Sequence, residues 1–90
     1  MKILYVKHHS RTSLQIHKNR DELWKVLEGF AHVELEDRVF LVSTGDAIKV
    51  SKNMKHRITT EDKPCAILEI SLGEFNEKDV VRIQDDYNRL

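Results

Sequence analysis

Residues 13–29 read SLQIHKNRDELWKVLEG, and this stretch decides the fold. Its first five residues alternate strictly between polar and apolar side chains, which is typical of a β-strand. Gln15 and His17 are two residues apart, so both point to the same face of that strand. A short polar loop follows, and Glu22 begins a second strand that ends at Gly29. The stretch therefore predicts two neighbouring β-strands that carry polar side chains on one face.

Short apolar or alternating runs separated by polar turns continue along the chain, at a spacing of ~8–12 residues. This pattern favours an all-β sandwich or barrel, and the length of 90 residues favours one domain over residues 1–90. From Asn76 onward the pattern changes, and we expect a short helical or irregular C-terminal tail. The expected strands are 2–7, 13–17, 22–27, 31–35, 38–42, 47–50, 56–59 and 65–72.

Composition excludes several classes of protein. The chain has 15 basic and 15 acidic residues and no basic stripe, so we expect no nucleic-acid partner. It has no long apolar run and no signal peptide, so we expect no membrane partner and a cytoplasmic location. The single cysteine, Cys65, lies in an apolar run and is predicted to be buried. Because so short a chain has a marginal core, we expect a homodimer.

Four side chains predict a metal site. Glu22 begins the strand after the loop, so we expect it opposite Gln15 and His17 across a hairpin. His56 begins a later strand and points inward together with Ile58. One amide oxygen, two imidazoles and one carboxylate suit a divalent ion, and Zn, Mn, Fe, Co and Ni all remain open. Trp24 is interpreted as a core or dimer-interface residue, with an inward position beside Glu22 as the alternative.

The chain resembles the cupin domain of type II mannose-6-phosphate isomerases. Residues 13–29 are similar to the family signature S-L-Q-x-H-H-H-R-A-E-H-W-x-V-x-x-G. The segment 56–58 is similar to the family's H-R-[LI], and residues 79–89 are similar to its D-I-V-R-x-E-D-x-Y-G-R. The same domain forms the C-terminal part of bifunctional mannose-1-phosphate guanylyltransferase/isomerases. The resemblance implies a single-domain cupin, a β-barrel of the jelly-roll type.

The resemblance also implies site residues and a reaction. One divalent metal ion would be held by Gln15, His17, Glu22 and His56. Arg20 and Glu22 would be the catalytic residues, and Lys18, Arg20 and Arg57 would bind the substrate phosphate. The family interconverts mannose 6-phosphate and fructose 6-phosphate by moving a proton between C1 and C2 through an enediol. A sugar phosphate is therefore the expected ligand.

Five departures from the family and general cupin patterns bear on the site. Lys18 and Asn19 replace two histidines, and Leu23 replaces a third. Ser51 and Asn53 stand where the general cupin pattern has proline and glycine. Three functions therefore remain open at this point. The chain could be a sugar-phosphate isomerase, a non-catalytic sugar-binding module associated with polysaccharide biosynthesis, or a cupin of another chemistry such as oxygenation at iron.

Overall fold

The computed structural model describes residues 1–73, 80–84 and 86. All regular structure in these residues is β-strand, which confirms the predicted all-β class. No helix in the described residues is long and apolar enough to cross a membrane. The strands are β1 (Lys2–Val6), β2 (Leu14–Ile16), β3 (Arg20–Glu28), β4 (Phe30–Leu35), β5 (Arg38–Ser43), β6 (Ala47–Val50), β7 (His56–Thr59), β8 (Cys65–Gly73) and β9 (Val81–Gln84).

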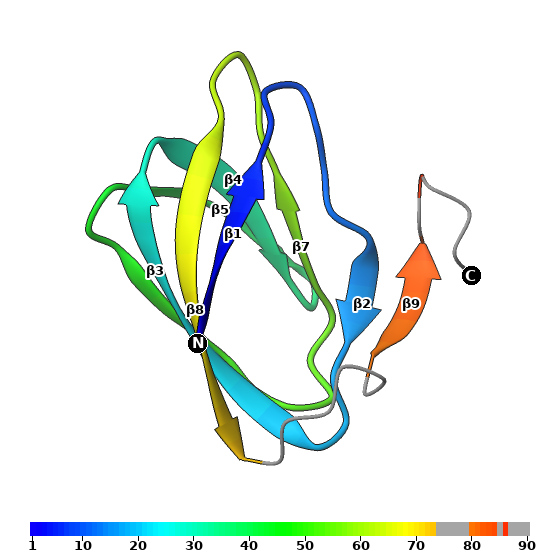
Figure 1. The fold of residues 1–90 in the computed structure, drawn as a ribbon. Coiled ribbons are helices and arrows are strands. Elements are labelled where there is room, and N and C mark those ends of the chain that lie inside the picture. The colour runs from blue at the N-terminus through cyan, green and yellow to red at the C-terminus, as the bar shows by residue number, and fades with distance from the viewer. Residues whose placement is uncertain (74–79, 85, 87–90) are drawn as a thin grey trace.

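The strands form two antiparallel sheets (Figure 1). One sheet has the order β1-β8-β3-β6 and the other has the order β5-β4-β7-β2-β9. The expected hairpin between the strands of Gln15 and Glu22 is wrong. The two strands belong to different sheets, because β2 pairs with β7 and β9 whereas β3 pairs with β6 and β8. The loop after His17 thus carries the chain from one sheet to the other.

The space between the sheets has an apolar end and a polar end. Along β3 the buried positions change from Arg20 and Glu22 to Trp24 and Val26. β8 runs antiparallel to β3, and its buried positions change from apolar to polar in the opposite direction, ending at Glu69. The core of the sandwich therefore fills only one end. The other end gathers buried polar groups, which lose their contacts with water and need partners within the protein.

The tail differs from the sequence prediction where the structure describes it. Val81–Gln84 form a strand, β9, which pairs with β2 at the edge of the sheet (Figure 1). The expected helical or irregular conformation is therefore wrong for these four residues, because backbone groups at the edge of β2 offer a pairing partner that outweighs the weak helical pattern. The predicted helix start at Asn76 lies outside the described residues. Cys65 is buried, as predicted.

Gly29 marks the turn from β3 to β4, where the chain crosses between the sheets. Its φ angle is 85°, a conformation that side chains rarely adopt. A Cβ atom at this position would also clash with the carbonyl oxygen of Pro64. Gly45 has a similar φ angle of 95°, but a Cβ atom there would have nothing within 4 Å. A side chain at Gly45 would therefore add backbone strain alone, whereas a side chain at Gly29 would add both backbone strain and a steric clash.

We predict that Gly29→Ala destabilises the protein more than Gly45→Ala does. Backbone strain costs about 1–2 kcal/mol in either variant. Crowding against Pro64 adds about 1–3 kcal/mol in the first variant alone. Urea denaturation of both variants and the parent chain measures the difference in the free energy of unfolding. Equal losses in the two variants would contradict the role of the close approach to Pro64.

Candidate metal centre

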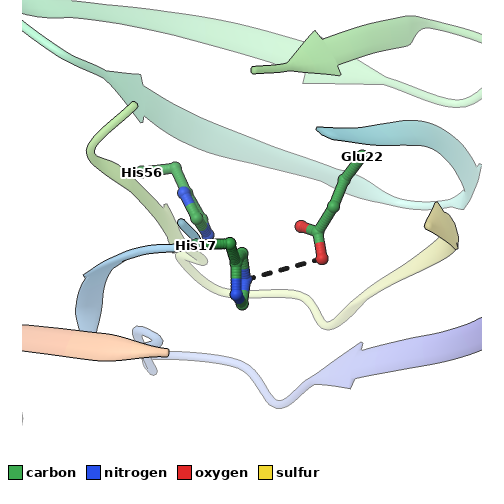
Figure 2. Close-up of side chains that lie close together, drawn as sticks. All are labelled: His17, Glu22 and His56. Carbon is green, nitrogen blue, oxygen red and sulfur yellow. Dashed lines mark ion pairs between the residues drawn. The ribbon is translucent and has the colours of Figure 1, made fainter. Parts of the chain in front are cut away.

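Three predicted ligands converge at the polar end of the sandwich. His17, Glu22 and His56 are all buried, and each offers a ligand atom that lies within 4.8 Å of the others. Figure 2 shows the three side chains pointing toward one another from different segments of the chain. His17 Nε2 lies 3.5 Å from Glu22 Oε2, and the two imidazole rings stack with their centroids 5.1 Å apart. Two imidazole nitrogens and a carboxylate oxygen are typical divalent-metal donors.

Gln15 belongs to the same cluster. It lies directly opposite His56 in the register of β2 and β7, so the two side chains share one face of that sheet. Both line a cavity of about 590 Å³ that also receives His17 and Glu22. The Gln15 amide oxygen accepts a hydrogen bond from Ser13 Oγ at 3.1 Å. The structure thus places all four residues that the sequence predicted as metal ligands on the lining of one cavity.

The backbone of His17 is held by the loop between β6 and β7. The Asn53 N–H donates a hydrogen bond of 2.7 Å to the His17 carbonyl. Asn53 has a φ angle of 64°, in the left-handed region that favours glycine and that asparagine tolerates better than most residues. Asparagine at this position of the family pattern therefore preserves the backbone turn. It also preserves the contact that positions the ligand.

His56 is poised to act as a neutral ligand. Its Nδ1 lies 3.0 Å from the carbonyl oxygen of Met54, and with the proton on Nδ1 this nitrogen donates. Nε2 is buried with no hydrogen-bond partner among the described residues. Burial lowers the pKa of His56, so the ring stays uncharged near neutral pH. An imidazole whose far nitrogen is anchored to a carbonyl is the arrangement that orients metal-binding histidines. The orphaned Nε2 therefore fits a metal ion.

Glu22 is an ionised carboxylate in a buried place, only 1% exposed. Burial by itself would raise its pKa, but hydrogen bonds from Glu69 and Trp24 and the nearby histidines outweigh this effect, and the pKa is lowered. The Trp24 indole N–H donates to Glu22 Oε1 at 3.1 Å. Trp24 is a buried core residue, as predicted, and it also takes the inward position beside Glu22 that was the alternative prediction. Its ring meets His56 edge-on. The indole orients one carboxylate oxygen and leaves the other toward the histidines.

Arg20 lies among the same donors. Its Nε and Nη2 are both 3.0 Å from Glu22 Oε2, and Nη2 is 3.4 Å from His17 Nε2. Nη2 also lies 3.7 Å from an oxygen of Glu69. The side chain is 5% exposed, so this cation is buried with its anions. Arg20 thus lies beside the ligands, as the sequence predicted for a catalytic or substrate contact. It also places a positive charge next to the donors that would hold a metal ion.

The sequence prediction missed Glu69. This carboxyl lies in the middle of the most apolar strand and is 3% exposed. Burial and the neighbouring Glu22 carboxylate raise the pKa of Glu69 to about 8, so at neutral pH it is mostly protonated and donates a hydrogen bond to Glu22. The sequence did contain a signal for this residue. Glu69 is an acidic residue flanked by leucine and isoleucine in an apolar strand, and acidic residues are almost never fully buried unless they are paired.

Two predicted phosphate-binding residues lie away from the cavity. Lys18 is exposed and does not line it. Arg57 is buried but points to the other face of β7, because His56 and Ile58 take the inward positions. Its guanidinium donates to the Thr12 carbonyl at 2.9 Å and to the side chain of Gln84 at 3.1 Å. These bonds tie three segments together, so the contacts of Arg57 are structural.

The chain is similar to proteins named for alginate and xanthan biosynthesis. It is 34% identical over 91 residues to the alginate biosynthesis protein AlgA of Pseudomonas aeruginosa, covering 99% of this chain and 19% of that protein. It is 33% identical over 91 residues to the xanthan biosynthesis protein XanB of Xanthomonas campestris pv. campestris, covering 99% of this chain and 20% of that protein. The chain therefore spans about a fifth of the length of these relatives.

Fold and family comparisons agree. A crystal structure of a cupin protein from Bacteroides fragilis superposes with a TM-score of 0.73 at 18% identity, covering 86% of this chain and 70% of that one. At this identity the likeness establishes the fold alone. The family model described as "Mannose-6-phosphate isomerase C-terminal" matches residues 1–85. The chain therefore has a cupin fold and belongs to the mannose-6-phosphate isomerase C-terminal family.

Proposed function

We propose that this chain is a metal-dependent sugar-phosphate isomerase domain that interconverts mannose 6-phosphate and fructose 6-phosphate or a related sugar phosphate. The observation that carries the proposal is the buried convergence of His17, Glu22 and His56 at a cavity of about 590 Å³. Family membership and relatives named for alginate and xanthan biosynthesis support a role in the supply of sugars for polysaccharides. A cytoplasmic location and the homodimer remain part of the proposal.

The donor set fits one divalent ion. Gln15, His17, Glu22 and His56 would hold it, and Zn, Mn, Co, Fe and Ni all accept such mixed nitrogen and oxygen ligands. A bound ion would polarise the hydroxyl and carbonyl oxygens of the sugar. Glu22 would accept a proton from the reacting carbons if it leaves the ion. Arg20 would contact a sugar oxygen from the side of the cavity that it already occupies.

The departures from the family pattern leave the cavity largely intact. Leu23 points to the outer face of its sheet and is 38% exposed, so the histidine it replaces would not reach the ligands. Lys18 and Asn19 are exposed. Asn53 adopts a φ angle of 64°, in the left-handed region that glycine also adopts readily. These observations favour an active isomerase over the alternative, a cupin that binds a sugar without turning it over.

We predict that the purified, tag-free chain binds close to one divalent ion, as a single cupin centre would. The metal-loaded protein should interconvert mannose 6-phosphate and fructose 6-phosphate, and chelator treatment should abolish turnover. His17→Ala and His56→Ala should both lose the metal, because each removes one of the few strong donors. Elemental mass spectrometry measures the metal and a coupled assay measures turnover, with His32→Ala on β4 as the control.

The two measurements separate the rival functions. Metal that disappears in both ligand variants, together with turnover, supports the isomerase. Metal without turnover, combined with thermal stabilisation by mannose 6-phosphate, supports the non-catalytic alternative. Unchanged metal content in His56→Ala would overturn the ligand assignment itself.

We predict that Arg20→Gln tightens metal binding while it lowers turnover. The Arg20 guanidinium contacts Glu22 and His17, the donors that would also hold a metal ion, so its removal would free them for the ion. A charge-assisted hydrogen bond contributes about 1.5–3 kcal/mol, which corresponds to a gain in affinity of about tenfold or more. Chelator competition with Zn²⁺ measures the affinity, and Arg38→Gln on the exposed strand β5 is the control. Weaker metal binding in a folded Arg20→Gln would contradict this competition.

The stability of the chelator-treated protein should depend on pH through Glu69. Because folding raises the pKa of Glu69 from 4.5 to about 8, the folded chain holds this proton more tightly than the unfolded chain does. The resulting stabilisation is full below about pH 4.5 and is lost as the pH rises through about 8. Glu69→Gln keeps a hydrogen-bond donor but cannot titrate. Urea denaturation across this range should show the parent chain losing stability relative to the variant. A difference that stays constant with pH would refute the buried, protonated Glu69.

A further inference from the structure

The loop between β6 and β7, residues 51–55, holds both candidate histidine ligands through its backbone. We call this segment the ligand loop. The Asn53 N–H donates a hydrogen bond of 2.7 Å to the His17 carbonyl. The next carbonyl along the chain, that of Met54, lies 3.0 Å from His56 Nδ1, which is the nitrogen opposite the orphaned Nε2. The conformation of this loop therefore sets how the two imidazoles lie relative to each other.

The start of the ligand loop is fastened to β3 beside the third ligand. Val50, the last residue of β6, lies opposite Glu22 in the register of the two strands. Asp21 immediately precedes Glu22, so its side chain points to the outer face of the sheet. There its Oδ1 accepts a hydrogen bond of 2.8 Å from the Lys52 N–H. A side chain outside the cavity thus ties the carboxylate ligand's strand to the loop that holds the histidines.

The other end of the ligand loop is fastened to the turn between β4 and β5. Glu36 Oε1 accepts a hydrogen bond of 3.0 Å from the Lys55 N–H, and the Glu36 N–H donates to the Lys55 carbonyl at 2.9 Å. Both backbone polar groups of the residue before His56 are therefore bound to one residue. Glu36 makes these bonds at a φ angle of 53°, which is uncommon for residues other than glycine. A carboxylate thus holds each end of the loop.

The loop lacks the proline that would restrict it. Ser51 stands where the general cupin pattern has proline, and a proline ring would fix the φ angle and reduce the conformations open to the loop. Asp21 stands where the family signature has alanine, which offers the Lys52 N–H no acceptor. This chain therefore combines a less restricted loop with an additional hydrogen bond that restrains it.

We propose that Asp21 and Glu36 are positioning residues of the metal centre, which act by holding the ligand loop in the conformation that aims His17 and His56 at one point. Neither carboxylate lines the cavity, so both act through the loop rather than by direct contact. The proposal rests on the metal centre of the proposed function. Asp21 has the larger effect, because a chain without the Glu36 side chain keeps the backbone hydrogen bond between residues 36 and 55.

Chelator competition with Zn²⁺ tests the proposal on the parent chain and on Asp21→Ala, Asp21→Asn, Glu36→Ala and Asp46→Ala. Asparagine at position 21 keeps an oxygen that accepts from the Lys52 N–H but has no charge. Asp46 is the matched control, because its Oδ2 accepts a hydrogen bond of 2.8 Å from the Ser43 N–H in the turn between β5 and β6. Asp46→Ala therefore loses the same kind of bond outside the ligand loop. Urea denaturation measures the stability of each variant.

We expect Asp21→Ala to weaken Zn²⁺ binding by about tenfold or more, as happens when a group that orients a metal ligand is removed. Asp21→Asn should restore most of this affinity, and Glu36→Ala should lose less than Asp21→Ala does. Asp46→Ala should bind Zn²⁺ like the parent chain, even where it is equally destabilised. Parent-like affinity in Asp21→Ala, an equal loss in Asp46→Ala, or no recovery in Asp21→Asn would overturn the proposal.

Amide hydrogen exchange in the chelator-treated protein distinguishes this proposal from the proposed function. Without any metal, Asp21→Ala should speed exchange at the Lys52 and Asn53 amides, because the loop opens more often once its start is released. A chain that shows no turnover but responds in this way, and loses Zn²⁺ affinity, would refute the isomerase and support the positioning role. Exchange and affinity that both stay unchanged in Asp21→Ala, beside turnover that a chelator abolishes, would leave the isomerase standing and overturn the positioning role.

Discussion

The buried carboxylate of Glu22 is the constraint on which the rest of the site depends. A carboxylate that is 1% exposed needs charged or hydrogen-bonding partners to compensate for lost water. Glu22 obtains them from Arg20 on its own strand, from the Trp24 indole and from Glu69 on the neighbouring strand. These partners come from alternate residues along β3 and from β8, so the strand pairing assembles them. The stability of this end of the sandwich and the chemistry of the metal centre therefore depend on the same group.

This dependence explains why the sandwich is apolar at only one end. Val26 of β3 and Ile67 of β8 lie side by side in one sheet, and packed side chains close the space between the sheets there. Glu22 and Glu69 occupy inward positions nearer the other end of the same two strands, and there the two sheets enclose a cavity. A polar end contributes less hydrophobic stabilisation than a packed core would, and a small domain has little to spare. A polar end of this kind is expected where a protein gives up some stability for a functional site.

Much of the site could be predicted from the sequence because it follows strand alternation. Gln15 and His17 share a face at a spacing of two, and alternation places Glu22 and His56 inward on later strands, so local rules were enough to name the four residues but not to say how they meet. Sheet membership was beyond such rules. Pairing of β2 with β7 and of β3 with β8 depends on contacts between residues far apart in the chain. For the same reason Glu69 was missed and β9 was expected to be helical or irregular, since each owes its role to a partner strand.

The positions of the family motifs differ in what their side chains and backbone groups contact. Asn53 stands where the general cupin pattern has glycine, and it adopts the left-handed φ angle of 64° while its N–H donates to the His17 carbonyl. Leu23 replaces a histidine at a position that faces away from the ligands, where an apolar residue pairs across strands with Ile70. Arg57 keeps the residue type of the family, yet its hydrogen bonds to Thr12 and Gln84 are those of a structural tie. Residue identity within a motif therefore does not reveal which positions carry chemistry. The face of the strand does, because only inward positions reach Glu22 and the histidines.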